Sequence, residues 1–229
     1  MKALSIIANW LFVLCLPCLL LSGSIAWAVN SLWLYERGFV KYDIVRVTDI
    51  PQPELNKAAQ GLIAYFNSSG NAPIDIVVIK GGQPFTLFNQ REVAHLKDVK
   101  GLFQLDYKIL AVTLVYVLAY AGVCVFRRRW RRLATSVAFG SGLTLAIMLA
   151  LWIVSLVDFE GFFIQFHLIA FSNNLWELNP YTDYLLMMFP EGFWNDAVIF
   201  IAAGAAGVAV ALGGVAGWYF LAKRKAHGA

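Results

Sequence analysis

Four long apolar runs constrain the fold of this chain more than any other feature of its sequence. The runs cover residues 4–29, 107–126, 133–157 and 193–221, and few polar side chains interrupt them. Each run reaches the ~20 residues that a helix needs to cross the hydrocarbon core of a bilayer. Because a backbone in lipid must satisfy its own hydrogen bonds, the runs predict four membrane-spanning helices.

The composition agrees with an integral membrane protein. Of the 229 residues, 60% are hydrophobic and 14% are charged, whereas soluble domains carry about a quarter charged residues. The formal net charge of +4 is compatible with nucleic-acid binding. The positions of the basic residues favour membrane topology instead, and no nucleic-acid partner is expected.

Basic residues follow the ends of the apolar runs. Five arginines and Trp130 form the segment 127–132, a Lys-Arg-Lys triplet occupies 223–225, and the segment 158–192 has neither Lys nor Arg. Positive residues near span ends are retained in the cytoplasm. The loop 127–132, the tail 223–229 and both termini are therefore expected inside. We interpret the arginine cluster as a topology signal that also contacts anionic lipid headgroups.

The first run leaves an alternative open. Ala26-Trp27-Ala28 has the small-x-small form of a signal-peptidase site, so residues 1–29 are either a spanning helix or a cleaved leader. The apolar run is longer than the ~7–15 residues of a signal-peptide core, which favours retention. The spans are then 1–29, 107–126, 133–157 and 193–222, with residues 30–106 and 158–192 outside.

The segment 30–106 predicts a small extracytoplasmic cap of mixed α and β structure. Residues 42–47 are expected to form a strand, and residues 54–66 show the apolar spacing of a helix. Residues 75–79 and 84–88 flank Gly81-Gly82 and predict a β-hairpin. Asn89 precedes Glu92 by three residues, which predicts a capped helix over 90–103. The fold class is an all-α transmembrane bundle of four spans with a small α+β cap.

Two outer segments each carry a histidine beside other polar groups. On the helix 90–103, His95 lies one turn from Arg91 and from Asp98. In the second segment, His167 lies among phenylalanines, and amides and carboxylates follow it between Asn173 and Asp183. One interpretation is an interfacial amphipathic helix with a structural histidine. The other is a polar pocket at the outer membrane face, because aromatic anchoring does not require so many amides and acids.

These two segments resemble a known family. "FNQREVAHLKDVKGLF" at 88–103, "FHLIAFSNNLWELNP" at 166–180 and "FPEGFW" at 189–194 are similar to signatures of a family of four-span bacterial membrane proteins. That family includes the lipoprotein intramolecular transacylase of Gram-positive bacteria. The resemblance covers essentially the whole chain in span order and loop lengths.

The resemblance implies a reaction at the outer face of the bacterial cell membrane. An acyl chain leaves the glycerol sn-2 oxygen of a diacylglyceryl lipoprotein and joins the α-amine of its N-terminal cysteine, giving a lyso-form lipoprotein. The implied partners are such lipoproteins and membrane lipid. The family's motif histidines fall on His95 and His167. Its other motif residues, expected to bind substrate or support the site, fall on Arg91, Glu92, Asp98, Asn174 and Trp176.

The residue types suit this chemistry. An α-amine is largely protonated near neutral pH, so a neutral histidine is needed to free it. His95 is the expected base, oriented by Asp98 and Arg91, and His167 is expected to hold the ester or glycerol end. Arg91 or Asn174 would stabilise the oxyanion. No protein nucleophile, metal or cofactor is required, and the short-spaced H-E-x-x-H zinc motif does not occur.

Two other functions remain open on the sequence alone. One is a non-catalytic membrane factor that binds a partner or lipid through its outer loops. The other is a different lipid-modifying enzyme built on the same residues.

Overall fold

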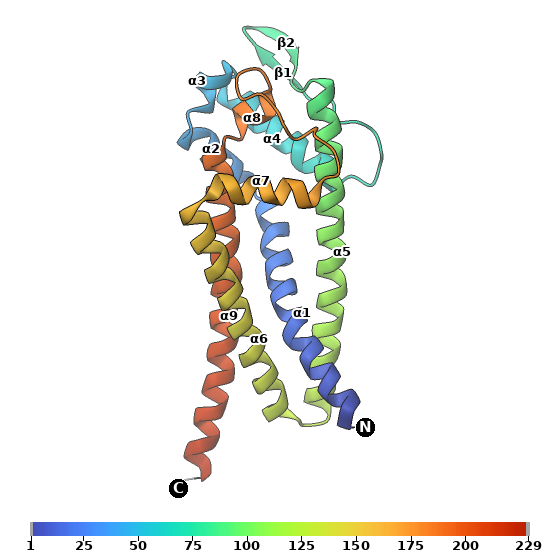
Figure 1. Ribbon diagram of the computed structural model, residues 1–229, viewed down its shortest axis with the longest axis vertical. Helices are drawn as coiled ribbons and strands as arrows, with labels where there is room; N and C mark the ends of the chain where they lie inside the picture. The colour runs from blue at the N-terminus through green and yellow to red at the C-terminus, as the bar shows by residue number, and fades with distance from the viewer. Residues whose placement is uncertain (1, 228–229) are drawn as a thin grey trace. The chain divides into compact units, whose positions relative to one another are not determined.

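The computed structural model describes residues 2–227, and the side chains of residues 4–224. Two compact units emerge from the contacts within the chain (Figure 1). Met1–Ile25, Asp106–Ile153 and Phe200–Ala229 form one, which we call the span unit. Ala26–Leu105 and Val154–Ile199 form the other, which we call the cap unit. The predicted fold class, a four-span helical bundle with a small α+β cap, is confirmed.

Four long helices supply the span unit. They are α1 (Lys2–Val29), α5 (Gln90–Phe126), α6 (Trp130–Val157) and α9 (Glu191–His227). Each contains an 18-residue window with a mean hydropathy between 2.2 and 2.4. The apolar stretch of α5 begins only after Lys108, so about the first five turns of this helix carry the polar side chains expected outside lipid.

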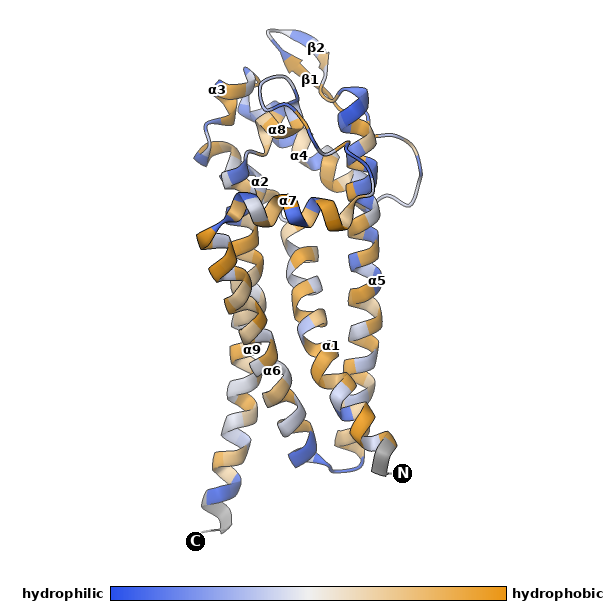
Figure 2. Ribbon diagram, viewed as in Figure 1, coloured by the Kyte–Doolittle hydropathy of each residue, from blue (hydrophilic) through white to orange (hydrophobic). Residues whose placement is uncertain are grey.

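The span unit buries two small clusters of side chains and exposes many large hydrophobic ones. Phe12, Leu16, Tyr120 and Cys124 form one buried cluster, and Met148, Ala202 and Ala205 form another. The alanines of α9 let helices approach closely, as is common where lipid is the solvent. Side chains such as Val112 and Phe126 are 69% and 89% exposed, and most of each long helix is hydrophobic in Figure 2. These exposed positions are suited to acyl chains.

The cap unit has a core of its own. Its short elements are α2 (Leu32–Lys41), α3 (Ile44–Thr48), α4 (Gln52–Asn67), β1 (Val77–Lys80), β2 (Gln83–Thr86), α7 (Phe159–Ala170) and α8 (Tyr184–Met188). Phe39, Ile50, Leu55, Val78 and Met188 are fully buried among them. Burying a side chain of this size contributes about 1.5–3 kcal/mol. This core fixes the elements that carry the candidate site.

The hairpin and the helix α4 are confirmed. β1 and β2 pair antiparallel, with Lys80 opposite Gln83. Gly81 and Gly82 between them have φ of 57° and 78°. Glycine adopts such positive φ values more readily than any other residue, and a tight two-residue hairpin turn uses them. The strands are shorter than predicted, and α4 begins at Gln52, slightly before the expected 54.

The predicted strand over 42–47 is wrong. Residues Ile44–Thr48 form the short helix α3, between Asp43 and Asp49 in the left-handed conformation. The β-branched residues there favour a strand in isolation. Ile44 and Thr48, however, are both 1% exposed, whereas Arg46 between them is exposed. In a strand all three side chains would lie on one face, but in a helix only residues 44 and 48 share a face. Burial of that face outweighs local propensity.

Two further features differ from the prediction. The expected helix 90–103 does not stop before the second span, because α5 is continuous from Gln90 to Phe126. The segment 158–192, expected as a loop, contains α7 and α8, and α2 was not predicted either. The hydropathy signal located the spans but carried no information on these short amphipathic helices.

Candidate functional site

The N-terminus of α5 is closed by the predicted capping pair. The side-chain oxygen of Asn89 accepts hydrogen bonds from the backbone N–H groups of Arg91 and Glu92, at 2.9 and 3.0 Å. Glu92 Oε2 in turn accepts from the backbone N–H of Asn89 at 2.7 Å. This reciprocal cap fixes where the helix begins, and hence which face carries His95.

Glu92 also joins α5 to α8. Its carboxylate is buried, and Oε1 accepts a hydrogen bond from the backbone N–H of Leu185 at 2.7 Å. Burial raises the pKa of Glu92, while the N–H groups of Leu185 and Asn89 act in the opposite direction. Both carboxylate oxygens are therefore engaged in holding the cap unit together.

His95 lies one turn further along α5 and is 6% exposed. Its Nδ1 is buried and has no hydrogen-bond partner among the described residues. Burial and then the neighbouring His167 lower the pKa of His95 to about 4, against the opposing effect of Asp98. The imidazole ring of His95 is thus neutral near pH 7. Its Nδ1 is left to form a hydrogen bond with a bound molecule.

His167 is fixed by the helix that carries it. The Asp158 carboxylate caps α7 by accepting a hydrogen bond from the backbone N–H of Gly161 at 2.9 Å. The carboxylate lies so close to Gly161 that a Cβ atom at this position would clash with it. Within α7, Nδ1 of His167 lies 2.7 Å from the carbonyl oxygen of Phe163. A carbonyl only accepts, so in the neutral ring Nδ1 donates and Nε2 keeps its lone pair. Burial lowers the pKa of His167, opposed by this hydrogen bond.

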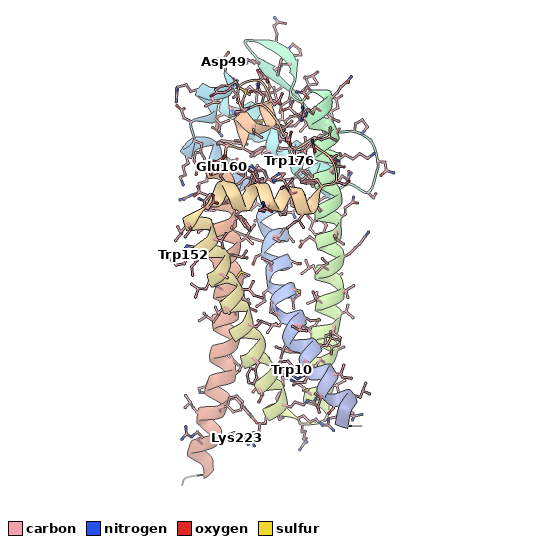
Figure 3. The ribbon with its side chains drawn as sticks, in the orientation of Figure 1. Trp10, Asp49, Trp152, Glu160, Trp176 and Lys223 are labelled. Carbon is pink, nitrogen blue, oxygen red and sulfur yellow. The ribbon has the colours of Figure 1, made fainter. Side chains whose placement is uncertain are left out.

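The structure brings the two predicted histidines together. Their ring centroids are 6.1 Å apart, although 72 positions separate them in sequence (167 − 95). Aromatic rings surround the pair: Phe163 and Trp176 lie 4.3 and 5.0 Å from His167, and Phe171 lies 5.1 Å from His95. Trp176 is labelled near α7 in Figure 3. The two imidazole rings therefore lie in apolar surroundings. Because such surroundings disfavour the charged form, both rings are held neutral.

Two polar contacts hold the segment after α7 against α5. An Nη atom of Arg91 donates to the backbone carbonyl of Asn174 at 2.6 Å, and the Asn173 side-chain amide donates to Asp98 at 2.9 Å. We call these two contacts the polar clamp. Arg91 and Asp98 thus form hydrogen bonds with this segment, and neither forms one with His95, whose Nδ1 has no partner among the described residues. That these two residues orient the His95 ring stays a prediction. The side chain of Asn174 is exposed, so only its backbone joins the clamp.

Sequence reasoning missed Asn173 and Phe163. Asn173 and Asn174 are consecutive amides, and only the three-dimensional contacts distinguish them. Phe163 precedes His167 by four residues, a spacing that would have suggested the backbone contact had α7 been recognised as a helix. The described residues contain no group of three His, Cys, Asp or Glu side chains arranged to hold a metal ion.

The fold resembles a solved membrane protein over nearly its whole length. The lipoprotein intramolecular transacylase Lit from Bacillus cereus superposes with a TM-score of 0.85 at 18% identity, covering 99% of this chain and 100% of that chain. Variants of that protein with one histidine replaced by arginine or by alanine each superpose with a TM-score of 0.80. With four apolar helices of spanning length, this fold makes the chain a multi-pass membrane protein.

Sequence comparisons extend this likeness to the family. A curated protein of Aquifex aeolicus (strain VF5), described as uncharacterized, is 28% identical over 173 residues, which is 74% of this chain and 75% of that protein. The family model described as lipoprotein intramolecular transacylase Lit matches residues 10–194, a range that contains both histidines and the polar clamp. The chain belongs to the lipoprotein intramolecular transacylase family.

Proposed function

We propose that this protein is an intramolecular transacylase acting on diacylglyceryl lipoproteins, with His95 and His167 as its catalytic residues. The acyl chain moves from the glycerol sn-2 oxygen to the α-amine of the N-terminal cysteine of the same substrate molecule. The observation that supports these roles best is the approach of two neutral imidazoles, 6.1 Å apart, inside an aromatic surround. Family membership supports the reaction, and this geometry supports the residues.

His167 is the general base in this proposal. The α-amine of a cysteine has a pKa of about 7.7–8.0, so much of it is protonated near neutral pH. The contact between Nδ1 and the Phe163 carbonyl leaves the lone pair on Nε2, which can accept a proton from the amine. This assignment differs from the expectation that His95 is the base, because His167 is the ring whose tautomer is fixed by a hydrogen bond.

His95 supplies a neutral N–H donor. A pKa of about 4 makes its ring a weak base, but a neutral imidazole can still donate one hydrogen bond to a developing oxyanion. As the amine nitrogen attacks the ester carbonyl, the negative charge collects on the carbonyl oxygen, and a donor there lowers the barrier. A buried donor needs little reorganisation during the step, which suits a site closed by aromatic rings.

The remaining steps conserve every atom. The amine reacts in its neutral form, after its ammonium proton has passed to solvent. The new C–N bond forms as His167 accepts one N–H proton of this amine, and collapse of the tetrahedral intermediate breaks the C–O bond to glycerol. The imidazolium then returns its proton to the departing glycerol oxygen. Donor and acceptor belong to one molecule, so no acyl-enzyme intermediate is needed. The product is an isomer of the substrate, with an N-acyl cysteine and a free glycerol hydroxyl.

The polar clamp and the aromatic rings have supporting roles. Arg91 and Asp98 act by fixing the segment that follows α7, which carries Phe171 and Trp176 to the histidines. Glu92 supports α5 through its cap. The aromatic side chains suit the apolar parts of a lipid substrate. The site is expected at the outer leaflet, with both termini cytoplasmic, because the basic segments 127–132 and 223–225 mark the inner side.

A defined substrate tests the proposal. The purified full-length protein in detergent micelles would be incubated with a synthetic diacylglyceryl lipopeptide and, as a control, with the same lipopeptide already acetylated on its α-amine. Because the reaction is an isomerisation, the total mass must not change. Fragmentation by mass spectrometry should reveal a cysteine that carries the long acyl chain on its nitrogen, together with a monoacylglyceryl group, only for the lipopeptide with a free amine. Release of free fatty acid instead would identify a lipase and overturn the proposal.

A further inference from the structure

A second polar site lies in the span unit, far in sequence from the histidines. A cavity of about 510 Å³ is bordered by the turn between α5 and α6, together with Asn9 of α1 and Tyr219 of α9. Its lining residues are Asn9, Arg128, Arg129, Trp130, Arg131, Arg132, Thr135 and Tyr219. In Figure 2 the turn is hydrophilic, whereas the flanking helices are mainly hydrophobic. A strongly cationic cavity thus lies at the end of the apolar helices.

The groups that line this cavity can donate hydrogen bonds to an anion. No Asp or Glu is among the lining residues, and the four arginine side chains form no ion pair with any side chain in the described range 4–224. The side-chain oxygen Oδ1 of Asn9 accepts hydrogen bonds from the hydroxyl groups of Tyr120 and Ser136, at 3.1 and 2.6 Å. The side-chain amide nitrogen of Asn9 forms no hydrogen bond with a described residue, so it can donate one to a ligand. The backbone also contributes, because α6 begins at Trp130 and its N-terminal turn carries partial positive charge.

The surroundings indicate that the anion belongs to a lipid. The turn follows directly on the apolar stretch of α5, whose last residue, Phe126, is 89% exposed. Trp218 beside Tyr219 is 70% exposed, and Trp130 in the cavity wall is 47% exposed. Tryptophan and tyrosine prefer the level of the lipid headgroups, with their rings towards the acyl chains. A ligand bound here would therefore have its anionic part among the arginines and its apolar part beside these exposed rings.

We infer that this cavity binds the phosphate headgroup of an anionic phospholipid from the leaflet at this end of the span unit. Guanidinium groups suit phosphate oxygens because they donate two parallel hydrogen bonds in one plane. The bound lipid would hold α1, α5, α6 and α9 together at their ends, independently of any chemistry at the histidines.

The test measures lipid retention by the full-length protein. Native mass spectrometry would count bound phosphatidylglycerol and phosphatidylcholine after release from mixed micelles, with inorganic phosphate as a competitor. Arg131→Gln and Arg132→Gln should each weaken phosphatidylglycerol binding about fivefold, since one arginine near an anionic surface contributes about 1 kcal/mol. Arg127→Gln is the matched control, because Arg127 belongs to the same basic segment but does not line the cavity.

Each outcome decides for or against the site. Preferential retention of phosphatidylglycerol, lost in the two cavity variants and kept in Arg127→Gln, supports it. Arg132→Lys, which keeps the charge, should retain more lipid than Arg132→Gln, and this comparison holds even if glutamine lowers stability. Equal loss in Arg127→Gln would mean unspecific attraction to the whole segment. Equal binding of phosphatidylcholine, or displacement by millimolar phosphate, would also overturn a lipid headgroup site.

Discussion

At the scale of single residues, a backbone contact distinguishes the two histidines. His167 donates from Nδ1 to the Phe163 carbonyl, so its Nε2 is defined as the acceptor, whereas Nδ1 of His95 has no partner in the part of the chain that the structure describes. Neither feature could be predicted from the sequence. The family resemblance predicted both histidines as site residues, but the tautomer of His167 depends on a helix, α7, that was not expected. The proposed division of roles between base and hydrogen-bond donor rests on this contact.

Both histidines should be essential for turnover. We expect His167→Ala to lower the rate of acyl transfer by at least ~10²-fold, the lower end for losing general acid–base assistance. We expect His95→Ala to lower it by about 10²–10³-fold, the usual effect of removing an oxyanion hydrogen-bond donor. His227→Ala is the matched control, because it removes the third histidine of the chain, near the end of α9. The measurement is initial rate on a diacylglyceryl lipopeptide, with thermal stability of each variant recorded alongside. A folded His167→Ala protein with wild-type turnover would refute the base assignment.

The low pKa of His95 also makes stability depend on pH. Its value of about 4 in the folded protein lies below the ordinary 6.5, so the unfolded chain binds a proton first as the pH falls. The stability that this difference contributes is complete above pH 6.5 and is lost as the pH falls towards 4. The full difference corresponds to about 3 kcal/mol.

This effect can be measured by thermal unfolding between pH 7.5 and 4.5. We expect the unfolding temperature of the wild-type protein to fall more steeply than that of His95→Asn, which cannot titrate. The His227→Ala variant should follow the wild type. Parallel curves for wild type and His95→Asn would show that His95 titrates normally in the folded protein.

At the scale of elements, the polar clamp connects the helix α5 to the segment after α7, which lies far away in the sequence. Asp98 of α5 and Asn173 after α7 share one hydrogen bond, and Arg91 adds another to the carbonyl of Asn174. These contacts position the segment that carries Phe171 and Trp176. The clamp should therefore affect catalysis through the placement of rings and not through direct contact with substrate.

An exchange of partners tests this positioning role. Asn173→Ala should lower turnover about 10- to 100-fold, the usual effect of removing a group that orients catalytic residues. Asn173→Asp should do so as well, because it places two carboxylates together. The double variant Asp98→Asn with Asn173→Asp restores a hydrogen bond in the reverse direction and should recover most of the activity. If both single variants retain wild-type turnover, the clamp has no positioning role.

The elements also show what the sequence could and could not predict. Hydropathy located the spans, and Gly81-Gly82 located the hairpin, because each signal has one dominant physical cause. The cap of α5 was predictable because Asn89 and Glu92 interact locally. The helix α3 was not, since the β-branched residues around Val45 favour a strand. Only the burial of Ile44 and Thr48 together with the exposure of Arg46 selects the helix. Asn173 was missed for the same reason: its partner, Asp98, is 75 residues away.

At the scale of the whole molecule, the basic segments predict the orientation in the membrane. In a protein without its three native cysteines, a cysteine at Ser69 should react with an impermeant maleimide added to intact cells. A cysteine at Arg129 should react only after the membrane is opened, because the segment 127–132 is expected to remain in the cytoplasm. The opposite pattern would place the histidines on the cytoplasmic side and contradict the proposed site at the outer leaflet.

The most direct test of the central claim is the chemical state of lipoproteins in living cells. The chain would be expressed in a bacterial host that lacks N-terminal lipoprotein acylation, and the N-terminal lipopeptides would be sequenced by mass spectrometry. The wild-type protein should convert diacylglyceryl cysteine into N-acyl, monoacylglyceryl cysteine, and the His95→Ala, His167→Ala double variant, expressed at the same level, should not. Free α-amines in cells that express the folded wild-type protein, or N-acylation that persists with the double variant, would contradict the account.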